Sequence, residues 1–100
     1  MKLGILVTSD KHLKQVIGLV HAAAKKGLQV AVFCMDKGTL LINHQAFKDL
    51  CMLEGINISL CRHSAEKMNI NMQKISKDIV CGSQFNNAIM QHEADKVIVL

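Results

Sequence analysis

The chain of 100 residues has no tryptophan and no tyrosine, and its only aromatic residues are Phe33, Phe47 and Phe85. Nucleic-acid-binding surfaces commonly combine clustered Arg and Lys with aromatic side chains that stack on bases. The formal net charge is +4, but the lysines are scattered along the chain and Arg62 is the only arginine. We therefore expect no nucleic-acid partner.

Long apolar runs are also absent, since no segment approaches the roughly 20 apolar residues that span a bilayer. The apolar stretch from Leu3 to Val7 is too short for the hydrophobic region of a signal peptide, and polar residues follow it at once. We expect a cytoplasmic protein with no membrane partner. In that reducing compartment the 4 cysteines are expected to be free thiols.

Several sequence signatures of cofactor and metal sites are missing as well. The segment from Thr8 to Asp10, after the first apolar run, is neither a glycine-rich dinucleotide loop nor a Walker phosphate loop. No Cys-x-x-Cys pair is present, which argues against thioredoxin-type dithiol exchange. It also argues against a zinc site assembled from Cys34, Cys61, Cys81 and His63. We expect neither a metal nor a cofactor.

What the chain does have is apolar residues, which make up 50% of it and are mostly aliphatic side chains, Ala and Met. A chain of this length is expected to fold as one domain, residues 1–100, without stabilising disulfide bonds or metal ions. Small domains this rich in apolar residues often bury part of them between copies of the same chain. We therefore expect a homo-oligomer.

The apolar residues alternate between the patterns of strands and helices. Short apolar runs predict buried parallel strands, and apolar residues spaced three and four apart predict helices. Such alternation is typical of a three-layer α/β/α fold with a single, mainly parallel sheet of four to five strands. The predicted strands are 3–8, 28–33, 56–61 and 97–100, and the predicted helices are 11–26, 44–54, 62–68 and 84–94.

Two segments fit more than one structure. Thr39 to Ile42 is either a short strand or the start of a helix, and Met72 to Lys77 is either helix or loop. Ser9 and Asp10 precede the clearest helix, and both residue types are favoured at helix N-caps. We expect them to cap it.

The carboxyl ends of parallel strands share one edge, where open α/β sheets bind their ligands. Cys61 ends a predicted strand at this edge and is followed at once by Arg62 and a predicted helix. A thiol at a helix N-terminus next to a cationic group has a lowered pKa. We therefore expect Cys61 to be a reactive thiolate with Arg62 as a helper.

The other thiols and His63 are weaker candidates. Cys51 lies on an apolar helix face and is expected in the core, where free cysteine is common. Cys34 and Cys81 are each either buried filler or part of the same crevice as Cys61, and both interpretations stay open. His63 could act as a proton donor or cationic neighbour of Cys61, although no third residue is visible to orient it.

Three short motifs carry a resemblance to a known family. They are the strand Gly55 to Cys61 that ends in a single cysteine, the closing segment Ala94 to Val99, and the turn Asp36-Lys37-Gly38. With these, in order from end to end, the sequence resembles the DsrE/TusD-like, or YchN-like, family of small sulfur-relay proteins. Lys37 departs from the family pattern, because it interrupts an Asp-Gly turn.

The resemblance implies a three-layer fold, a trimer or hexamer, and a cysteine that carries sulfane sulfur as a persulfide without a cofactor. Cys61 is the position that matches this carrier. Its partners would be sulfur donor and acceptor proteins or small persulfides. Two alternatives stay open: a non-catalytic assembly or regulatory subunit with a structural Cys61, and a module that binds a small molecule or a metal.

Overall fold

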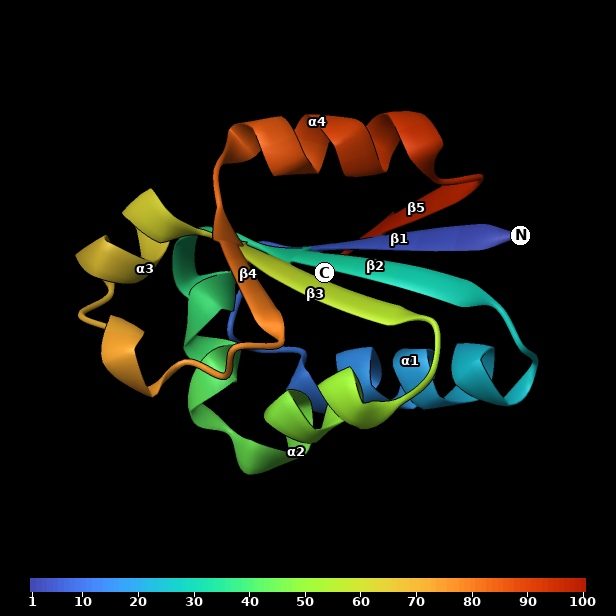
Figure 1. Cartoon of the computed structure of the whole chain (residues 1–100), viewed down its shortest axis with the longest axis horizontal. Coiled ribbons are helices and arrows are strands. Elements are labelled where there is room, and N and C mark those ends of the chain that lie inside the picture. The colour runs from blue at the N-terminus through green and yellow to red at the C-terminus, as the bar shows by residue number, and fades with distance from the viewer.

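Five parallel strands form one sheet at the centre of the computed structural model, which describes residues 1–100 (Figure 1). Their order across the sheet is β4-β3-β2-β1-β5, and every neighbouring pair is parallel. This arrangement confirms the predicted α/β class. The strands are β1 (Lys2–Val7), β2 (Gln29–Cys34), β3 (Ile56–Cys61), β4 (Ile79–Gly82) and β5 (Lys96–Val99).

Helices cover both faces of the sheet, so the three predicted layers are present (Figure 1). Helices α1 and α2 lie on one face, α4 lies on the other, and α3 lies beyond the end of β3. Three short 3₁₀ helices complete the connections. The helices are α1 (Leu13–Lys25), η1 (Asp36–Asn43), α2 (Gln45–Lys48), η2 (Asp49–Met52), α3 (Arg62–Lys67), η3 (Met72–Lys74) and α4 (Gln84–Glu93).

The two faces of the sheet carry separate apolar clusters. On β2, Val32 and Cys34 belong to the larger cluster, which contains side chains of α1 and α2, while Phe33 belongs to a smaller one with Met90 of α4. Fully burying a Val or Phe side chain stabilises a fold by about 1.5–3 kcal/mol. Burial on both faces explains why β2 is apolar at successive positions and does not alternate with polar residues.

The connections change face where the chain reverses direction across the sheet. The chain steps from β1 to β4 with its connections on the side of the larger cluster, and α4 then carries it across the other face to β5. Right-handed crossovers require this change of face. The segments that leave the neighbouring strands β3 and β4 therefore diverge to opposite faces, which is where parallel sheets open a ligand crevice.

The segment between β2 and β3 differs from the prediction. The open segment Thr39 to Ile42 is part of the 3₁₀ helix η1, and the predicted helix 44–54 is shortened to α2 and η2. Phe47, Leu50 and Leu53 all pack against the larger cluster. Phe47 lies in α2, Leu50 lies in η2 and Leu53 follows η2 directly. A spacing of three residues keeps side chains on about the same side of such helical turns, so all three reach the core.

The predicted caps of α1 are wrong. The helix begins at Leu13 and is preceded by His12, which makes no side-chain cap hydrogen bond. The Ser9 hydroxyl instead accepts a hydrogen bond from the Lys11 backbone N–H at 3.0 Å. Ser side chains readily form such local turns, and here the turn ends before the helix starts.

Strand β4 was not predicted as a separate element. It has only four residues, Ile79–Gly82, and it lies at an edge of the sheet. Its outer side faces solvent, so it lacks the longer apolar run that identifies the central strands. No helix in this fold is long and apolar enough to cross a membrane.

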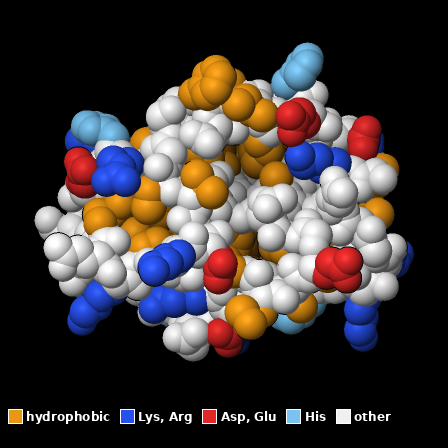
Figure 2. Space-filling view, in the orientation of Figure 1, with side chains coloured by type: hydrophobic (Ala, Val, Ile, Leu, Met, Phe, Trp, Pro, Cys, Tyr) orange, Lys and Arg blue, Asp and Glu red, His pale blue; other side chains and the backbone are white.

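Hydrophobic side chains reach the surface around α4 (Figure 2). Phe85 on α4 is 72% exposed, Ile89 one turn later is 40% exposed, and Val80 on β4 is 54% exposed. Helix α4 packs on β1 and β2. The part of this face formed by β3 and β4 therefore has no helix of its own above it.

Candidate functional site

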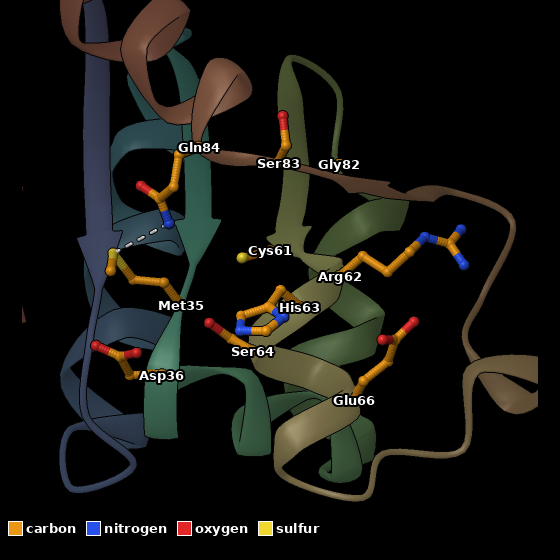
Figure 3. Close-up of a pocket in the computed structure, with 10 residues that line it drawn as sticks. All are labelled: Met35, Asp36, Cys61, Arg62, His63, Ser64, Glu66, Gly82, Ser83 and Gln84. Carbon is orange, nitrogen blue, oxygen red and sulfur yellow. Dashed lines mark hydrogen bonds between the residues drawn. The ribbon is translucent and has the colours of Figure 1, made fainter.

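A pocket of about 710 Å³ opens at the carboxyl ends of β3 and β4, where their connections diverge. Cys61 and Gly82, the last residues of the two strands, are paired in the sheet register. Figure 3 shows side chains from three segments around the Cys61 sulfur. The lining residues are Met35 and Asp36 after β2, Cys61, Arg62, His63, Ser64 and Glu66 at β3 and α3, and Gly82, Ser83 and Gln84 at β4 and α4.

The Cys61 side chain is at once buried and part of the pocket wall. The residue is 6% exposed and packs with Phe33 and Met90 beneath α4. It also lines the pocket, so the small exposed part of the residue faces this space. The opening of the pocket, and not a large exposed surface, gives access to this thiol.

The pKa of Cys61 is lowered from its ordinary value, although burial alone would raise it. The hydroxyl and backbone N–H of Ser64, the Gln84 carboxamide and the backbone N–H of His63 outweigh burial. Donors that face a sulfur favour its charged form. Cys61 is the N-cap residue of α3, and its side chain makes no cap hydrogen bond to the helix.

Gln84 is held at the pocket by the first turn of α4. The Ser83 side chain accepts from the Phe85 N–H at 3.2 Å, and the Asn86 side chain accepts from the Ser83 N–H at 2.9 Å. This capping box fixes the start of the helix, of which Gln84 is the first residue. Its carboxamide nitrogen donates to the Met35 sulfur at 3.7 Å.

Gly82 leaves the room that this arrangement needs. A Cβ at this position would collide with the side-chain oxygen of Asn86, which belongs to the capping box. The same residue lies opposite Cys61 on β3 and lines the pocket. A side chain here would disturb both the start of α4 and the approach to the thiol.

Arg62 and His63 both line the pocket, but they are placed differently. The guanidinium group of Arg62 points away from the Cys61 sulfur, whereas the imidazole of His63 lies on the same side of the pocket as that sulfur (Figure 3). The groups that lower the pKa of Cys61 belong to Ser64, Gln84 and His63, and Arg62 is not among them. The expected electrostatic help from Arg62 is therefore not what this geometry provides.

The structure does not bring Cys34 or Cys81 to the pocket. Both pack with the larger cluster, on the face of the sheet opposite Cys61. Cys34 is fully buried, and burial raises its pKa from 9.0 to about 12. Successive side chains of a strand point to opposite faces, so a thiol one residue earlier on β4 than Gly82 faces away from Cys61.

Cys51 packs against the larger cluster, as its position on an apolar helix face predicts. Burial and then the charge of Asp78 raise its pKa. All four cysteines are free thiols. No group of three or more His, Cys, Asp or Glu side chains is placed to hold a metal ion.

Sequence reasoning missed three residues around Cys61, namely Ser64, Gln84 and Met35. Ser64 had a local signal, because it is the third residue of the predicted helix after Cys61, where its hydroxyl and N–H can reach back. Gln84 and Met35 had none, since they come from the segments after β4 and β2 and meet Cys61 only in the folded sheet.

The comparison with protein families agrees with the fold. The profile of the DsrE/DsrF-like family matches residues 1–100, the whole chain. The chain belongs to the DsrE/DsrF-like family. The predicted family resemblance is thereby confirmed, and this family is associated with sulfur relay.

A solved structure has the same fold as this DsrE/DsrF-like chain. The structure of the ychN protein from E. coli covers 100% of this chain and is itself covered over 100% of its length, with a TM-score of 0.73. The two sequences are 14% identical, so the likeness concerns the fold. No curated protein sequence matches the chain.

Proposed function

We propose that this protein is a sulfur carrier, which holds sulfane sulfur as a persulfide on Cys61 and passes it to a partner thiol. The proposal rests on one observation: of the four cysteines, only Cys61 lines the pocket at the carboxyl ends of β3 and β4. Its lowered pKa and the family association with sulfur relay support the same role.

The reaction needs only thiolate chemistry. The Cys61 thiolate attacks the outer sulfur of a donor persulfide R–S–SH, so a new S–S bond forms as the donor S–S bond breaks. The electron pair leaves with the donor as R–S⁻, and Cys61 is left as Cys61–S–SH. Attack of an acceptor thiolate on the outer sulfur reverses this sequence and regenerates Cys61. No net oxidation or reduction occurs, so no cofactor takes part.

The thiolate fraction decides how fast this exchange proceeds, together with access to the sulfur. Ser64 and Gln84 favour the thiolate, and the open pocket gives access. Cys34 fails on both counts, since it is fully buried and its pKa is raised to about 12. The fold therefore separates one reactive thiol from the others.

Intact mass spectrometry tests the proposal. We expect the protein to gain the mass of one sulfur atom after incubation with a small persulfide such as cysteine persulfide, and to lose it on reduction. Cys61→Ser should gain nothing, whereas the control variant Cys81→Ser should gain sulfur like the wild type. An unchanged mass of the wild-type protein would contradict the proposal.

A second candidate function is that of an assembly or regulatory subunit with a structural Cys61. The 6% exposure of Cys61 and its packing with Phe33 and Met90 favour this alternative. It predicts that iodoacetamide modifies native Cys61 as slowly as it modifies Cys34. A carrier predicts that Cys61 reacts first among the four cysteines, so peptide mapping after a short exposure separates the two functions.

The carrier is proposed to act as a homo-oligomer, a trimer or hexamer, with sulfur donor and acceptor proteins or small persulfides as its partners. The exposed apolar side chains of Phe85, Val80 and Ile89 support self-association, because side chains of this kind are costly to leave in water. They lie next to the segment Gly82 to Gln84 that lines the pocket. Partners that reach Cys61 would therefore approach beside this surface.

A further inference from the structure

Gln84 is the side chain of α4 that reaches into the Cys61 pocket. Its carboxamide points toward the Met35 sulfur and lies on the same side of the pocket as the Cys61 sulfur (Figure 3). The amide nitrogen donates to Met35 Sδ at 3.7 Å. This nitrogen carries two N–H groups, so one donor remains for a second acceptor.

The position of this amide is fixed by the start of α4 and by the Met35 sulfur. The capping box of Ser83 and Asn86 sets the first turn of α4, and Gly82 leaves space for the Asn86 side chain. The Met35 sulfur holds the amide end. A thioether is a weak acceptor, so it orients the amide without binding it tightly.

We propose that Gln84 is a catalytic residue of the sulfur transfer, and that its carboxamide donates to the outer sulfur of the Cys61 persulfide. This inference rests on the proposed carrier function. In the unloaded protein one N–H of the amide is held by Met35, and the other is left for Cys61. When Cys61 is loaded, the amide donates to the new outer sulfur.

The geometry of a persulfide supports this role. An S–S bond is about 2.05 Å long, so the outer sulfur can stand up to that distance farther into the pocket than Cys61 Sγ. The donors on α3 directly follow Cys61 in the chain, whereas Gln84 comes from a separate segment, the first turn of α4. A hydrogen bond to an anion is stronger than one to a neutral group, so the amide favours the charged persulfide over Met35.

Charge is conserved through the step. As the thiolate attacks the donor R–S–SH, one S–S bond forms and one breaks, and the electron pair departs on R–S⁻. The proton of the outer sulfur is lost to water because persulfides are acidic, which leaves an anion at the place that the Gln84 amide faces. The same amide also lowers the pKa of the empty Cys61.

The test compares Gln84→Ala and Gln84→Glu with Gln91→Ala. Gln91 lies on the same helix, and its amide donates to Asn87 at 3.3 Å, away from the pocket. Gln84 is exposed at the surface, so its replacement should leave the fold intact. Two measurements are needed: the pH midpoint of Cys61 alkylation by iodoacetamide, and the rate at which cysteine persulfide adds sulfur to the intact protein.

For Gln84→Ala we expect the alkylation midpoint to rise by about one pH unit and both rates at pH 7 to fall about tenfold, as when a charged group loses a hydrogen bond. Gln84→Glu should raise the midpoint further and lower both rates further, because a carboxylate repels the thiolate and the persulfide anion. Gln91→Ala should match the wild type. Wild-type values for both Gln84 variants would overturn the inference.

Met35→Leu tests how the amide is held, since Leu keeps the volume but offers no acceptor. We expect its alkylation midpoint to stay or fall, because the amide then donates to Cys61 alone. A rise equal to that of Gln84→Ala would show that Met35 is needed to hold Gln84 near Cys61. It would contradict the proposal that the amide can leave the Met35 sulfur for the Cys61 persulfide. If the wild-type protein takes up no sulfur, the carrier function fails, while the alkylation data still decide whether Gln84 serves the thiolate.

Discussion

At the scale of single residues, two cysteines on opposite faces of the sheet have pKa values shifted in opposite directions. Cys34 and Cys61 each end a strand, yet Cys34 points into the larger core and Cys61 into the pocket. Burial without a donor raises the pKa of Cys34 to about 12, and donors around Cys61 lower its pKa. Reactivity is therefore decided by neighbours and not by the end of a strand as such.

The raised pKa of Cys34 predicts a loss of stability in alkaline solution. Between pH 9 and about 12 the unfolded chain loses this proton while the folded chain keeps it. Stability then falls as pH rises, with a slope of up to about 1.36 kcal/mol per pH unit for one such group. Urea unfolding between pH 8 and 10.5 measures this slope.

Cys34→Ala should flatten the slope, although it lowers stability at every pH. Val32→Ala, which removes buried atoms from the same strand but no titrating group, should lower stability and keep the wild-type slope. All other titratable groups are the same in the three proteins, so their contribution cancels in the comparison. Equal slopes for Cys34→Ala and the wild type would contradict the assignment of the raised pKa to Cys34.

At the scale of elements, the contacts between segments decide which positions must stay small. Gly38 lies in η1 directly against the backbone carbonyl of Val7, whereas Gly18 lies within α1 with no atom of another segment nearby. Both are glycines in helical segments, and their sequence neighbours do not distinguish them. Gly38 is required because η1 approaches β1 closely, whereas no such contact requires Gly18.

Alanine substitution should therefore have opposite effects at the two positions. Gly18→Ala should stabilise the protein by about 0.5–1 kcal/mol, because Ala is the better residue within a helix. Gly38→Ala should destabilise it by about 1–3 kcal/mol, since its Cβ forces η1 away from β1. The free energy of urea unfolding measures both, and effects of the same sign at the two positions would be incompatible with this packing.

At the scale of the whole molecule, the crevice comes from the strand order. Because α4 alone returns across its face of the sheet, the connections after β3 and β4 part at Cys61 and Gly82. The same arrangement leaves the β3 and β4 part of that face without a helix and leaves Phe85 on α4 exposed. Pocket and apolar surface are thus two results of one topology.

The apolar surface predicts self-association that depends on α4. We expect analytical ultracentrifugation to show a trimer or hexamer, and Phe85→Ser to shift it to smaller species without loss of helix or strand signal in circular dichroism. Met52→Ser, at an 81% exposed apolar residue of η2, is the matched control and should leave the assembly unchanged. A wild-type monomer at micromolar concentration would refute the expected assembly.

The alternation of strands and helices, the apolar core and the candidate thiol could all be predicted from the amino-acid sequence, because each depends on residues close together in the chain. Short apolar runs mark buried strands, and a cysteine at the end of one such run marks Cys61. The resemblance predicted from three short motifs agrees with the DsrE/DsrF-like family model, which matches residues 1–100.

The residues that surround that thiol became clear only from the folded structure. Gln84 and Met35 reach it across neighbouring strands, Arg62 next to it points away, and Cys34 and Cys81 face the opposite side of the sheet. The physical reason is that the side-chain direction on a strand changes with every residue, and the neighbours of a pocket are set by strand order. Neither the side-chain direction nor the strand order can be read from the sequence before the strands are paired.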